Sequence, residues 1–230
     1  MPSKDSVRTT IIVALGVCLA CSLLVSATAV SLRPRQASNR LLDKKRNIVA
    51  AAGLLEQNGE VRKLFEERIR ARVVDMGSGE YVPDMDATTF DQRRASRDPE
   101  RSVRVPASED IAGIKRRAER AAVYLVEDED GRATKVILPV HGLGLWSTMY
   151  GFLALDASDL NTIRALVFYE HGETPGLGGE VDNPDWRALW NGKKAYGPDG
   201  EVRIDVVKGT VDPSRPGSEY RVDEIGRAHV

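Results

Sequence analysis

The chain has 230 residues, enough for one domain with a sizeable core and some additional segments. Its 33 basic and 34 acidic residues leave a formal charge of -1, so the overall charge gives no support to a nucleic-acid-binding or anionic-surface-binding class. Both cysteines, Cys18 and Cys21, fall in one apolar stretch near the N-terminus. Their position excludes a disulfide framework or a cysteine-rich metal site in the rest of the chain.

That apolar stretch is the first element expected along the chain. No charged residue occurs between Thr9 and Leu32. As a helix, these residues exceed the roughly 30 Å hydrocarbon core of a bilayer, so we predict a retained transmembrane anchor within residues 1–35. A cleaved secretion signal is the alternative, but its apolar region usually has only about 7 to 15 residues. A lipoprotein signal ending at Cys21 is weaker still, because Cys18 stands where a branched apolar residue is expected.

Basic residues flank the predicted anchor on both sides. More of them follow it, between Arg33 and Arg46, than precede it, at Lys4 and Arg8. The positive-inside rule, applied to this chain alone, would place the C-terminal side in the cytoplasm.

Residues 36–110 are expected to form a connecting region of helices and loops. Apolar side chains recur at helical spacing over residues 41–55, Asn58-Gly59 interrupts them, and the spacing resumes over residues 61–69. This pattern predicts two amphipathic helices after the anchor.

The next stretch, residues 81–105, is polar and punctuated by proline. It predicts a solvated loop, although its clustered arginines leave a basic partner-binding patch as the alternative. Ser108, followed by two acidic residues, predicts the start of a short helix whose solvent face carries Lys115, Arg116, Arg117 and Arg120.

From residue 121 the apolar spacing changes to that of strands, and turn residues separate the segments. Asn183-Pro184 also predicts the start of a short helix that carries Trp186. Because hairpin connections dominate, we predict an α+β domain over residues 111–223, with an antiparallel sheet flanked by helices. The predicted strands are Val123–Val126 and Thr134–Val140, joined by a turn ending at Gly131, followed by Met149–Leu155, Ile163–Tyr169 and Val202–Val207.

Two glycine-rich clusters, residues 142–151 and 170–179, are the most informative part of the sequence. Each combines glycines, which permit close backbone approach, with hydroxyl groups and large apolar side chains, and the second also holds carboxylates. This composition indicates a pocket for an aromatic, phosphorylated ligand.

Other chemistries have less support. His171 and Glu173 resemble metal ligands or an acid/base pair, but only three histidines occur in the chain, so no metal site is predicted. Ser147 and Thr148 lack the context of a hydrolase nucleophile, and Gly142-x-Gly144 does not extend to a dinucleotide fingerprint. No catalytic residue is therefore assigned.

Three motifs carry a resemblance to a known family: residues 144–154, residues 168–178 and Asn183-Pro-x-Trp186. Together they resemble the C subunit of the sodium-translocating NADH:quinone oxidoreductase, over the anchor and most of the remaining chain. The paralogous G subunit of the Rnf electron-transport complex has similar glycine-rich loops, with fewer Trp and Met residues.

The resemblance implies an FMN-carrying electron-transfer subunit of an inner-membrane complex that couples NADH:ubiquinone reduction to Na⁺ export. It implies a single-pass anchor, a periplasmic domain, the other subunits of the complex as partners, and no nucleic acid. The periplasmic placement is opposite to the one that the basic residues flanking the anchor indicate. We follow the family, because neighbouring helices of a complex can override a weak difference in flanking charge. In the family, a flavin transferase links FMN through a phosphoester to a threonine.

Site roles follow from the resemblance by residue type. Trp146 and Leu177 are expected to cover the apolar ring, while Glu173, Thr174 and Gly178 offer polar groups to the ring edge and ribityl chain. Thr148 and Lys208 are the candidates for the phosphate. A carboxylate at Glu173 would lower the reduction potential of a nearby flavin.

The sequence departs from the family pattern after Val222-Asp223. The family continues there with Gly-Leu-Ser-Gly-Ala-Thr-x-Thr, whose first threonine carries the flavin, whereas this chain reads Glu224-Ile-Gly-Arg-Ala-His-Val230. One reading frame for this ending matches a common sequencing adapter, so we expect residues 224–230 to be a non-native tail. The attachment threonine would then lie beyond Asp223, and the chain as given would be inactive alone.

Two other functions stay open at this stage. One is a membrane-anchored structural subunit that has the fold without the cofactor. The other is an Rnf-type electron carrier. The sequence beyond Asp223 would separate the first from an FMN carrier, and the complex that copurifies would separate the second.

Overall fold

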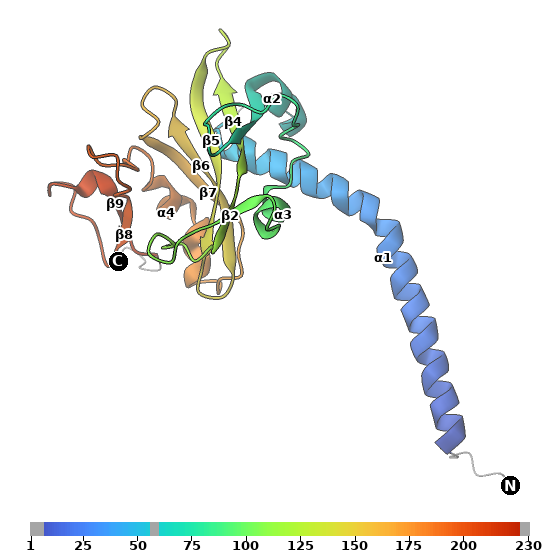
Figure 1. Cartoon of the computed structure of the whole chain (residues 1–230). Coiled ribbons are helices and arrows are strands. Elements are labelled where there is room, and N and C mark those ends of the chain that lie inside the picture. The colour runs from blue at the N-terminus through green and yellow to red at the C-terminus, as the bar shows by residue number, and fades with distance from the viewer. Residues whose placement is uncertain (1–6, 56–59, 226–230) are drawn as a thin grey trace. The chain divides into compact units, whose positions relative to one another are not determined.

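The computed structural model describes residues 7–55 and 60–225 (Figure 1). Two compact units divide the chain, Met1–Lys44 and Lys45–Val230. The predicted domain limits at residues 36 and 111 stay predictions. The tail predicted at residues 224–230 lies outside the described residues from 226 onward.

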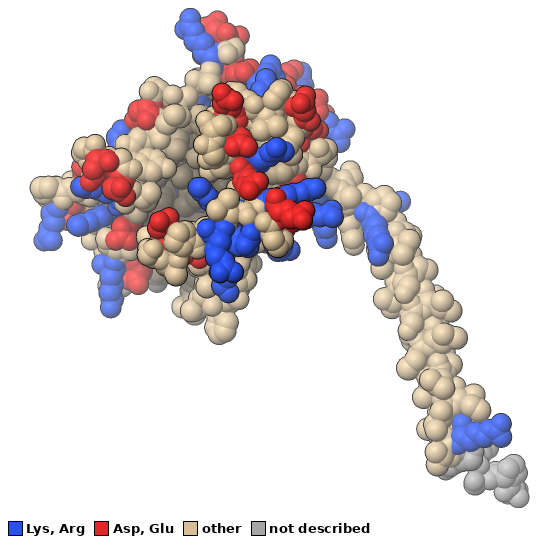
Figure 2. Space-filling view, viewed as in Figure 1, with Lys and Arg blue, Asp and Glu red and all other residues tan. Residues whose placement is uncertain are grey.

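The first unit holds most of helix α1 (Val7–Ala51). Its N-terminal part presents apolar side chains and no charge over residues 9–32 (Figure 2). This part of α1 is long and apolar enough to cross a membrane. A secretion signal near the N-terminus would meet the same criterion. The first amphipathic helix predicted, residues 41–55, is not separate: residues 41–51 continue α1, because neither glycine nor proline occurs between Pro34 and Gly53.

The last turns of α1 belong to the core of the second unit. Ile48 and Val49 are almost completely buried, and the helix stops where Gly53 adopts a φ of 72°. Lys135 of the sheet donates a hydrogen bond to the carbonyl oxygen of Ala52 at 2.6 Å. Burial lowers the pKa of this lysine, and the nearby Arg164 lowers it further. The lysine therefore satisfies a terminal carbonyl of the helix and fixes its end to the sheet.

A five-stranded antiparallel sheet forms the centre of the second unit, in the order β1-β4-β5-β6-β7. The predicted hairpin and the next two strands are confirmed as β4 to β7, and so is the predicted fold class. The strands are β1 (Ile69–Asp75), β4 (Arg120–Glu127), β5 (Ala133–Leu143), β6 (Thr148–Asp156) and β7 (Ile163–Glu170).

Apolar clusters cover both faces of the sheet. Successive side chains of a strand point to opposite faces, so neighbouring residues enter different clusters. Tyr124 and Phe152 pack against the end of α1 and against α2 (Val61–Arg68), in the largest apolar cluster. Leu153 and Leu155 belong to a second cluster, formed with residues of the C-terminal segment. The central strands β4, β5 and β6 therefore have few exposed residues, and those lie at the strand ends.

Strand β1 is a correction to the prediction for residues 61–69. The helix predicted there is α2, but it ends at Arg68 and Ile69 begins β1. From Ile69 the buried residues follow strand spacing, with Ile69 and Val73 inside and Arg70 exposed. Residue 69 fits both the helical and the strand period, which explains the error.

Residues 81–105 are not simply a solvated loop. They contain helix α3 (Gln92–Arg97), capped by the carboxylate of Asp91, and strand β2 (Ser102–Arg104). Strand β2 pairs with β3 (Arg116–Ala118) in a separate two-stranded sheet. Buried Ala95 and Ser102 anchor these short elements.

The helix predicted at Ser108 is wrong. Residues 106–114 form turns, and the carboxylate of Asp110 accepts hydrogen bonds from the backbone of Ile114 and Lys115 at 2.8 and 2.7 Å. Gly113 and Lys115 have φ values of 66° and 61°, which no right-handed helix permits. Asp110 acts as a turn former here, not as a helix N-terminal residue.

The C-terminal segment forms short elements against β6 and β7 (Figure 1). Asn183 caps α4 (Pro184–Ala188), as predicted. The strand predicted at residues 202–207 is shorter: it is β8 (Asp205–Val207), which pairs in parallel with β9 (Arg221–Asp223). The elements are the 3₁₀ helix η1 (Gly178–Asp182), α4 (Pro184–Ala188), β8 (Asp205–Val207), η2 (Ser218–Tyr220) and β9 (Arg221–Asp223).

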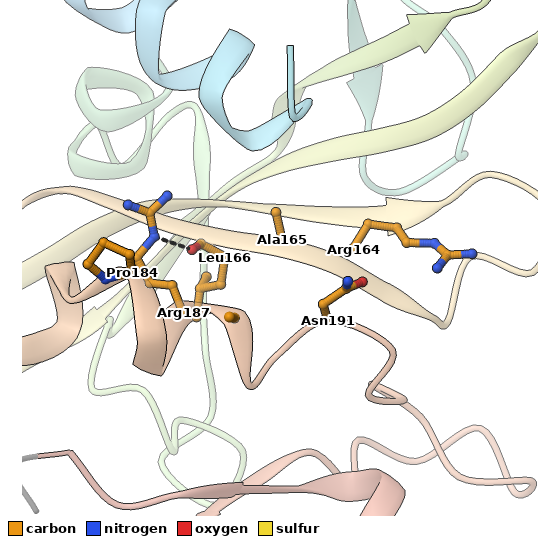
Figure 3. Close-up of a pocket in the computed structure, with 7 residues that line it drawn as sticks. Arg164, Ala165, Leu166, Pro184, Arg187 and Asn191 are labelled. Carbon is orange, nitrogen blue, oxygen red and sulfur yellow. Dashed lines mark hydrogen bonds between the residues drawn. The ribbon is translucent and has the colours of Figure 1, made fainter. Parts of the chain in front are cut away.

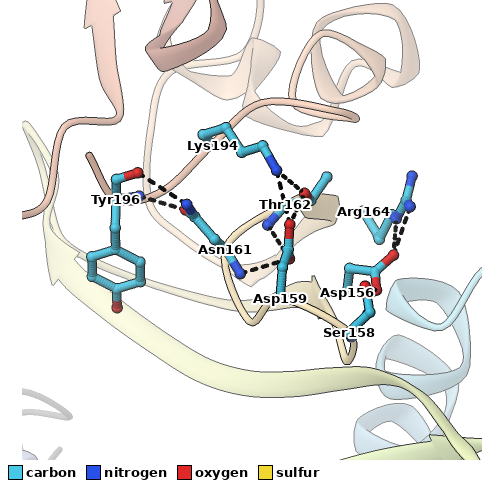
Figure 4. Close-up of polar contacts among 8 residues, drawn as sticks. All are labelled: Asp156, Ser158, Asp159, Asn161, Thr162, Arg164, Lys194 and Tyr196. Atoms are coloured by element: carbon cyan, nitrogen blue, oxygen red, sulfur yellow. Dashed lines mark hydrogen bonds and ion pairs between the residues drawn. The ribbon is translucent and has the colours of Figure 1, made fainter. Parts of the chain in front are cut away.

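A polar network at the β6–β7 turn fixes this segment to the sheet (Figure 4). Asp159 accepts hydrogen bonds from Thr162 and pairs with Lys194 at 2.8 Å, while Asn161 bonds the backbone of Tyr196 through both groups of its amide. The hydrogen bond from Lys194, with those from Thr162 and the backbone, lowers the pKa of Asp159 far below its usual range.

Candidate functional site

Sheet topology brings the two glycine-rich clusters to one end of the sheet. The first forms the loop between β5 and β6, and the second follows β7. Because β6 and β7 are antiparallel, the start of β6 lies beside the end of β7, with Tyr150 opposite Glu170. Residues about twenty-five positions apart in sequence therefore become neighbours.

Glu173 joins the two loops. Its Oε1 accepts a hydrogen bond from the backbone N–H of Trp146 at 3.1 Å. The same oxygen fills the space beside Gly144 where a Cβ would lie, and Oε2 would be 3.0 Å from a Cβ at Gly178. Two glycines thus make room for one carboxylate, which holds the β5–β6 loop against the segment after β7.

A tight turn then presents Leu177. The carbonyl of Thr174 accepts hydrogen bonds from the backbone N–H groups of Leu177 and Gly179, at 3.1 and 2.9 Å. Gly176 sits within the turn at a φ of 73°, a conformation that favours glycine. Leu177 and Trp146 are 65% and 69% exposed. Large apolar side chains this exposed, on two linked loops, are typical of a surface that a ligand or partner covers.

His171 braces the same segment. Its Nδ1 accepts a hydrogen bond from the backbone N–H of Glu173 at 3.3 Å, and its Nε2 lies 2.9 Å from a carboxylate oxygen of Asp182. This arrangement requires the proton on Nε2, which then donates to Asp182. Over residues 7–55 and 60–225, no group of three His, Cys, Asp or Glu side chains is placed to hold a metal ion.

The remaining two predicted residues lie on other elements. Thr148 is the first residue of β6, opposite Leu143 and half-buried. Lys208 is exposed directly after β8, where Val207 pairs with Asp223 and Gly209 accepts a hydrogen bond from Glu224. The described hydrogen bonds link Trp146 and Glu173, and they form the turn at Thr174, but none of them joins Lys208 to these loops.

Strand β9 connects to the site through an apolar cluster. Trp186 donates from its indole nitrogen to the carbonyl oxygen of Asp223 at 2.8 Å, and it packs with Val181 and Val222. Val181 lies in η1, which begins at Gly178. The chain at Asp223 is therefore held on the same packed unit as the turn that carries Leu177.

Arg93 is a neighbour of the site that sequence reasoning missed. Its guanidinium lies 3.4 Å from the ring centroid of Tyr150 and pairs with Glu170 at 2.8 Å. His141 stacks on the same tyrosine, and its pKa is lowered by burial and by Arg93. Arg93 falls in a polar stretch whose pattern gave no signal of a contact with the sheet.

A shallow groove of about 320 Å³ lies elsewhere, between β7 and α4 (Figure 3). Arg187 crosses it and donates from Nε to the carbonyl oxygen of Leu166 at 3.1 Å. None of its lining residues belongs to the predicted site. They are Arg164, Ala165, Leu166, Pro184, Arg187, Ala188 and Asn191.

Comparisons with known proteins show which proteins this chain is similar to. The FMN-binding domain family matches residues 144–228, which include both loops. The C subunit of the Na⁺-translocating NADH-quinone reductase of Pseudomonas aeruginosa is 51% identical, over 99% of this chain and 88% of that protein. Its counterpart in Vibrio alginolyticus is 48% identical, over 98% of this chain and 86% of that protein.

Solved structures show the same similarity. The crystal structure of NqrC from Shewanella oneidensis superposes with a TM-score of 0.74 and 36% identity, covering 82% of this chain and 85% of that one. The crystal structure of the corresponding reductase protein from Parabacteroides distasonis gives a TM-score of 0.60 and 30% identity, over 84% and 83% of the two chains.

Proposed function

The chain belongs to the NqrC family, the C subunits of the Na⁺-translocating NADH-quinone reductase, and we propose that it carries FMN as an electron-transfer subunit of such a complex. One observation carries this proposal: the residues matched to the FMN-binding family include both loops that the Glu173 carboxylate joins. Bound FMN supplies reversible electron transfer, and the protein supplies its position and electrostatic surroundings.

The residues present fit such a group. Exposed Trp146 and Leu177 offer apolar surface for a flat aromatic ring, while the glycines on either side of Glu173 allow close approach to the backbone. In this proposal Thr174 and Gly178 add polar groups of the tight turn.

The phosphate end is assigned to Thr148 and Lys208, whose hydroxyl and ammonium groups suit an anion. Support for Lys208 comes from the β8–β9 pairing, which places it beside the chain at Asp223. The family's attachment threonine would follow that point, and a flavin transferase would form the phosphoester.

The membrane arrangement is a further part of the proposal. The apolar part of α1 would anchor the chain in a bacterial inner membrane, with the second unit in the periplasm. The other subunits of the reductase would be its partners, and electron transfer to ubiquinone would be coupled to Na⁺ export. The chain without its partners would be inactive.

The test is to express the complete reading frame with and without a flavin transferase, and to examine the denatured chain on a gel under ultraviolet light. We expect a fluorescent band at the mass of the chain only with the transferase. A folded, membrane-bound chain that stays dark with an active transferase would favour the structural subunit without a cofactor. Copurification with an Rnf complex would favour the Rnf-type carrier.

A further inference from the structure

A β-bulge lies where the second glycine-rich cluster leaves the sheet. Strand β6 pairs Tyr150 with Glu170, but the next pair is Gly151 with Phe168. Tyr169 is therefore an extra residue of β7. A bulge of this kind bends its strand and redirects the residues beside it, so it sets the direction in which β7 enters the loop.

Gly151 makes room for the bulge. A Cβ at this position would lie 2.8 Å from the carbonyl oxygen of Val167 and 3.1 Å from the ring of Phe168. The backbone of β7 thus approaches β6 more closely than a side chain at residue 151 would allow. The glycine permits the bulge, but it offers no side-chain contact that would stabilise it.

Arg93 of α3 contacts all three residues at the bulge. Its guanidinium lies 3.4 Å from the ring centroid of Tyr150 and 5.4 Å from that of Tyr169, and its Nη1 is 2.8 Å from a carboxylate oxygen of Glu170. Consecutive residues of a regular strand point to opposite faces, so Tyr169 and Glu170 would not both face one guanidinium. The arginine therefore stabilises the bulged pairing over the regular one.

The two tyrosine rings are themselves supported by stacking. His141 stacks on Tyr150 with a centroid distance of 5.7 Å, and Phe152 of the core stacks on Tyr169 at 4.9 Å. The side chain of Arg93 is 34% exposed, and a cation over an aromatic ring binds more strongly as water is removed. The ion pair with Glu170, which is 57% exposed, contributes less. The ring contacts are therefore the main part of this interaction.

We propose that Arg93 is a positioning residue for the flavin, because it holds the bulge that directs the second glycine-rich cluster toward the first. The inference rests on the proposed function. Glu170 is followed directly by His171, which accepts the backbone N–H of Glu173. The Glu173 carboxylate in turn accepts the N–H of Trp146. A change in the direction of β7 at the bulge would thus displace this carboxylate.

The experiment compares Arg93→Met with Tyr150→Leu in the complete reading frame. Both variants remove the contact between the cation and the ring, but only Arg93→Met removes a charge. If the loops separate, the Glu173 carboxylate leaves the ring and the reduction potential of the flavin rises. Loss of a positive charge that acts on the flavin directly would lower the potential instead.

We expect both variants to raise the potential, measured by redox titration of the chain loaded by the flavin transferase. Noncovalent FMN affinity, measured by fluorescence quenching of the chain expressed without the transferase, should fall about fivefold to tenfold. Arg93→Met combined with Glu173→Gln should raise the potential no further than Glu173→Gln alone, because the displaced charge is already absent.

Arg94→Met is the matched control, because Arg94 is an exposed arginine of the same helix. Its potential and FMN affinity should equal those of the unaltered chain. An unchanged or lower potential in Arg93→Met overturns the proposal, and so does an unchanged potential in Tyr150→Leu, which alone decides the matter if Arg93→Met does not fold. An unaltered chain that binds no FMN contradicts the proposed function instead.

Discussion

Among single residues, Glu173 combines two properties that mutagenesis can separate, a negative charge and a hydrogen-bond acceptor. Glu173→Gln keeps an oxygen for the Trp146 N–H and removes the charge. Because a negative charge near FMN opposes the addition of electrons, we expect this variant to retain flavin and to show a higher reduction potential. A redox titration of the flavin-loaded chain measures it, and an unchanged potential would contradict the assignment.

Glu173→Ala removes the acceptor as well. The Trp146 N–H then loses its partner, and we expect a cost of about 1–3 kcal/mol together with separation of the two loops. Noncovalent FMN affinity, measured by fluorescence quenching, should fall at least tenfold relative to the Gln variant. Equal affinity for the Ala and Gln variants would show that the carboxylate does not organise the site.

Gly144→Ala tests the same contact from the other side. A Cβ there would overlap with Glu173 Oε1 and would lie 2.9 Å from the carbonyl oxygen of Ser147. We expect lower FMN affinity and a loss of about 1–3 kcal/mol in unfolding free energy, as for overpacked positions. The control is Gly142→Ala, whose Cβ would meet Ala112 at an ordinary 3.4 Å. Denaturant unfolding compares them, and equal curves for both variants would refute the packing argument.

The sequence contained part of the signal for this contact. Glycines beside Glu173 indicated a pocket, but no pattern showed that the carboxylate bonds the Trp146 backbone. The contacts of Arg93 and Lys208 were also beyond sequence reasoning, because each depends on how separate elements pack.

Among the elements, the β6–β7 turn predicts a pH dependence. The hydroxyl and N–H of Ser158, and then Arg164, lower the pKa of Asp156 from 3.8 to about 2. A lowered carboxyl pKa stabilises the fold above the unfolded pKa, and this stabilisation is lost as pH falls through the folded pKa. The difference in thermal midpoint between the unaltered chain and Asp156→Asn should therefore shrink between about pH 4 and pH 2.

Exposed Glu129→Gln, at the tip of the β4–β5 hairpin, is the control for this measurement. The difference in thermal midpoint between Glu129→Gln and the unaltered chain should not shrink in this way between about pH 4 and pH 2. If the difference in thermal midpoint between Asp156→Asn and the unaltered chain stays constant down to about pH 2, the turn contacts do not stabilise the fold.

The strands differed in how well sequence could locate them. Strands β4 to β7 were predictable because alternating apolar residues and clear turns mark them. Strand β1 was not, because Ile69 also continues the helical spacing of α2. The short pairs β2–β3 and β8–β9 depend on partners distant in sequence, which local patterns cannot reveal.

On the scale of the whole molecule, α1 contributes to both units. Ile48 and Val49 are 1% and 0% exposed, and burial of each such side chain contributes about 1.5–3 kcal/mol. A fragment beginning at Lys45 should therefore unfold cooperatively in circular dichroism, whereas one beginning at Glu60 should not. Cooperative unfolding of the shorter fragment at the same temperature would show that the end of α1 is not part of the core.

The apolar helix and the antiparallel sheet were predictable because composition and alternation determine them. That the apolar segment and the core residues Ile48 and Val49 belong to a single helix was not predictable, since the charged stretch after Leu32 suggested a boundary. Family resemblance assigned the cofactor region to the two glycine-rich loops, and the structure adds how Glu173 holds these loops together.

The most direct test of the central claim is NADH-driven reduction of the flavin on this chain in the assembled complex. Complexes assembled with flavin-loaded and flavin-free chain are mixed rapidly with NADH, and absorbance at the flavin band is followed together with quinone reduction. We expect the flavin of this chain to be reduced before quinone is, and quinone reduction to be lost in the flavin-free complex. Equal quinone reduction with and without that flavin would contradict the assignment of this chain as an electron carrier.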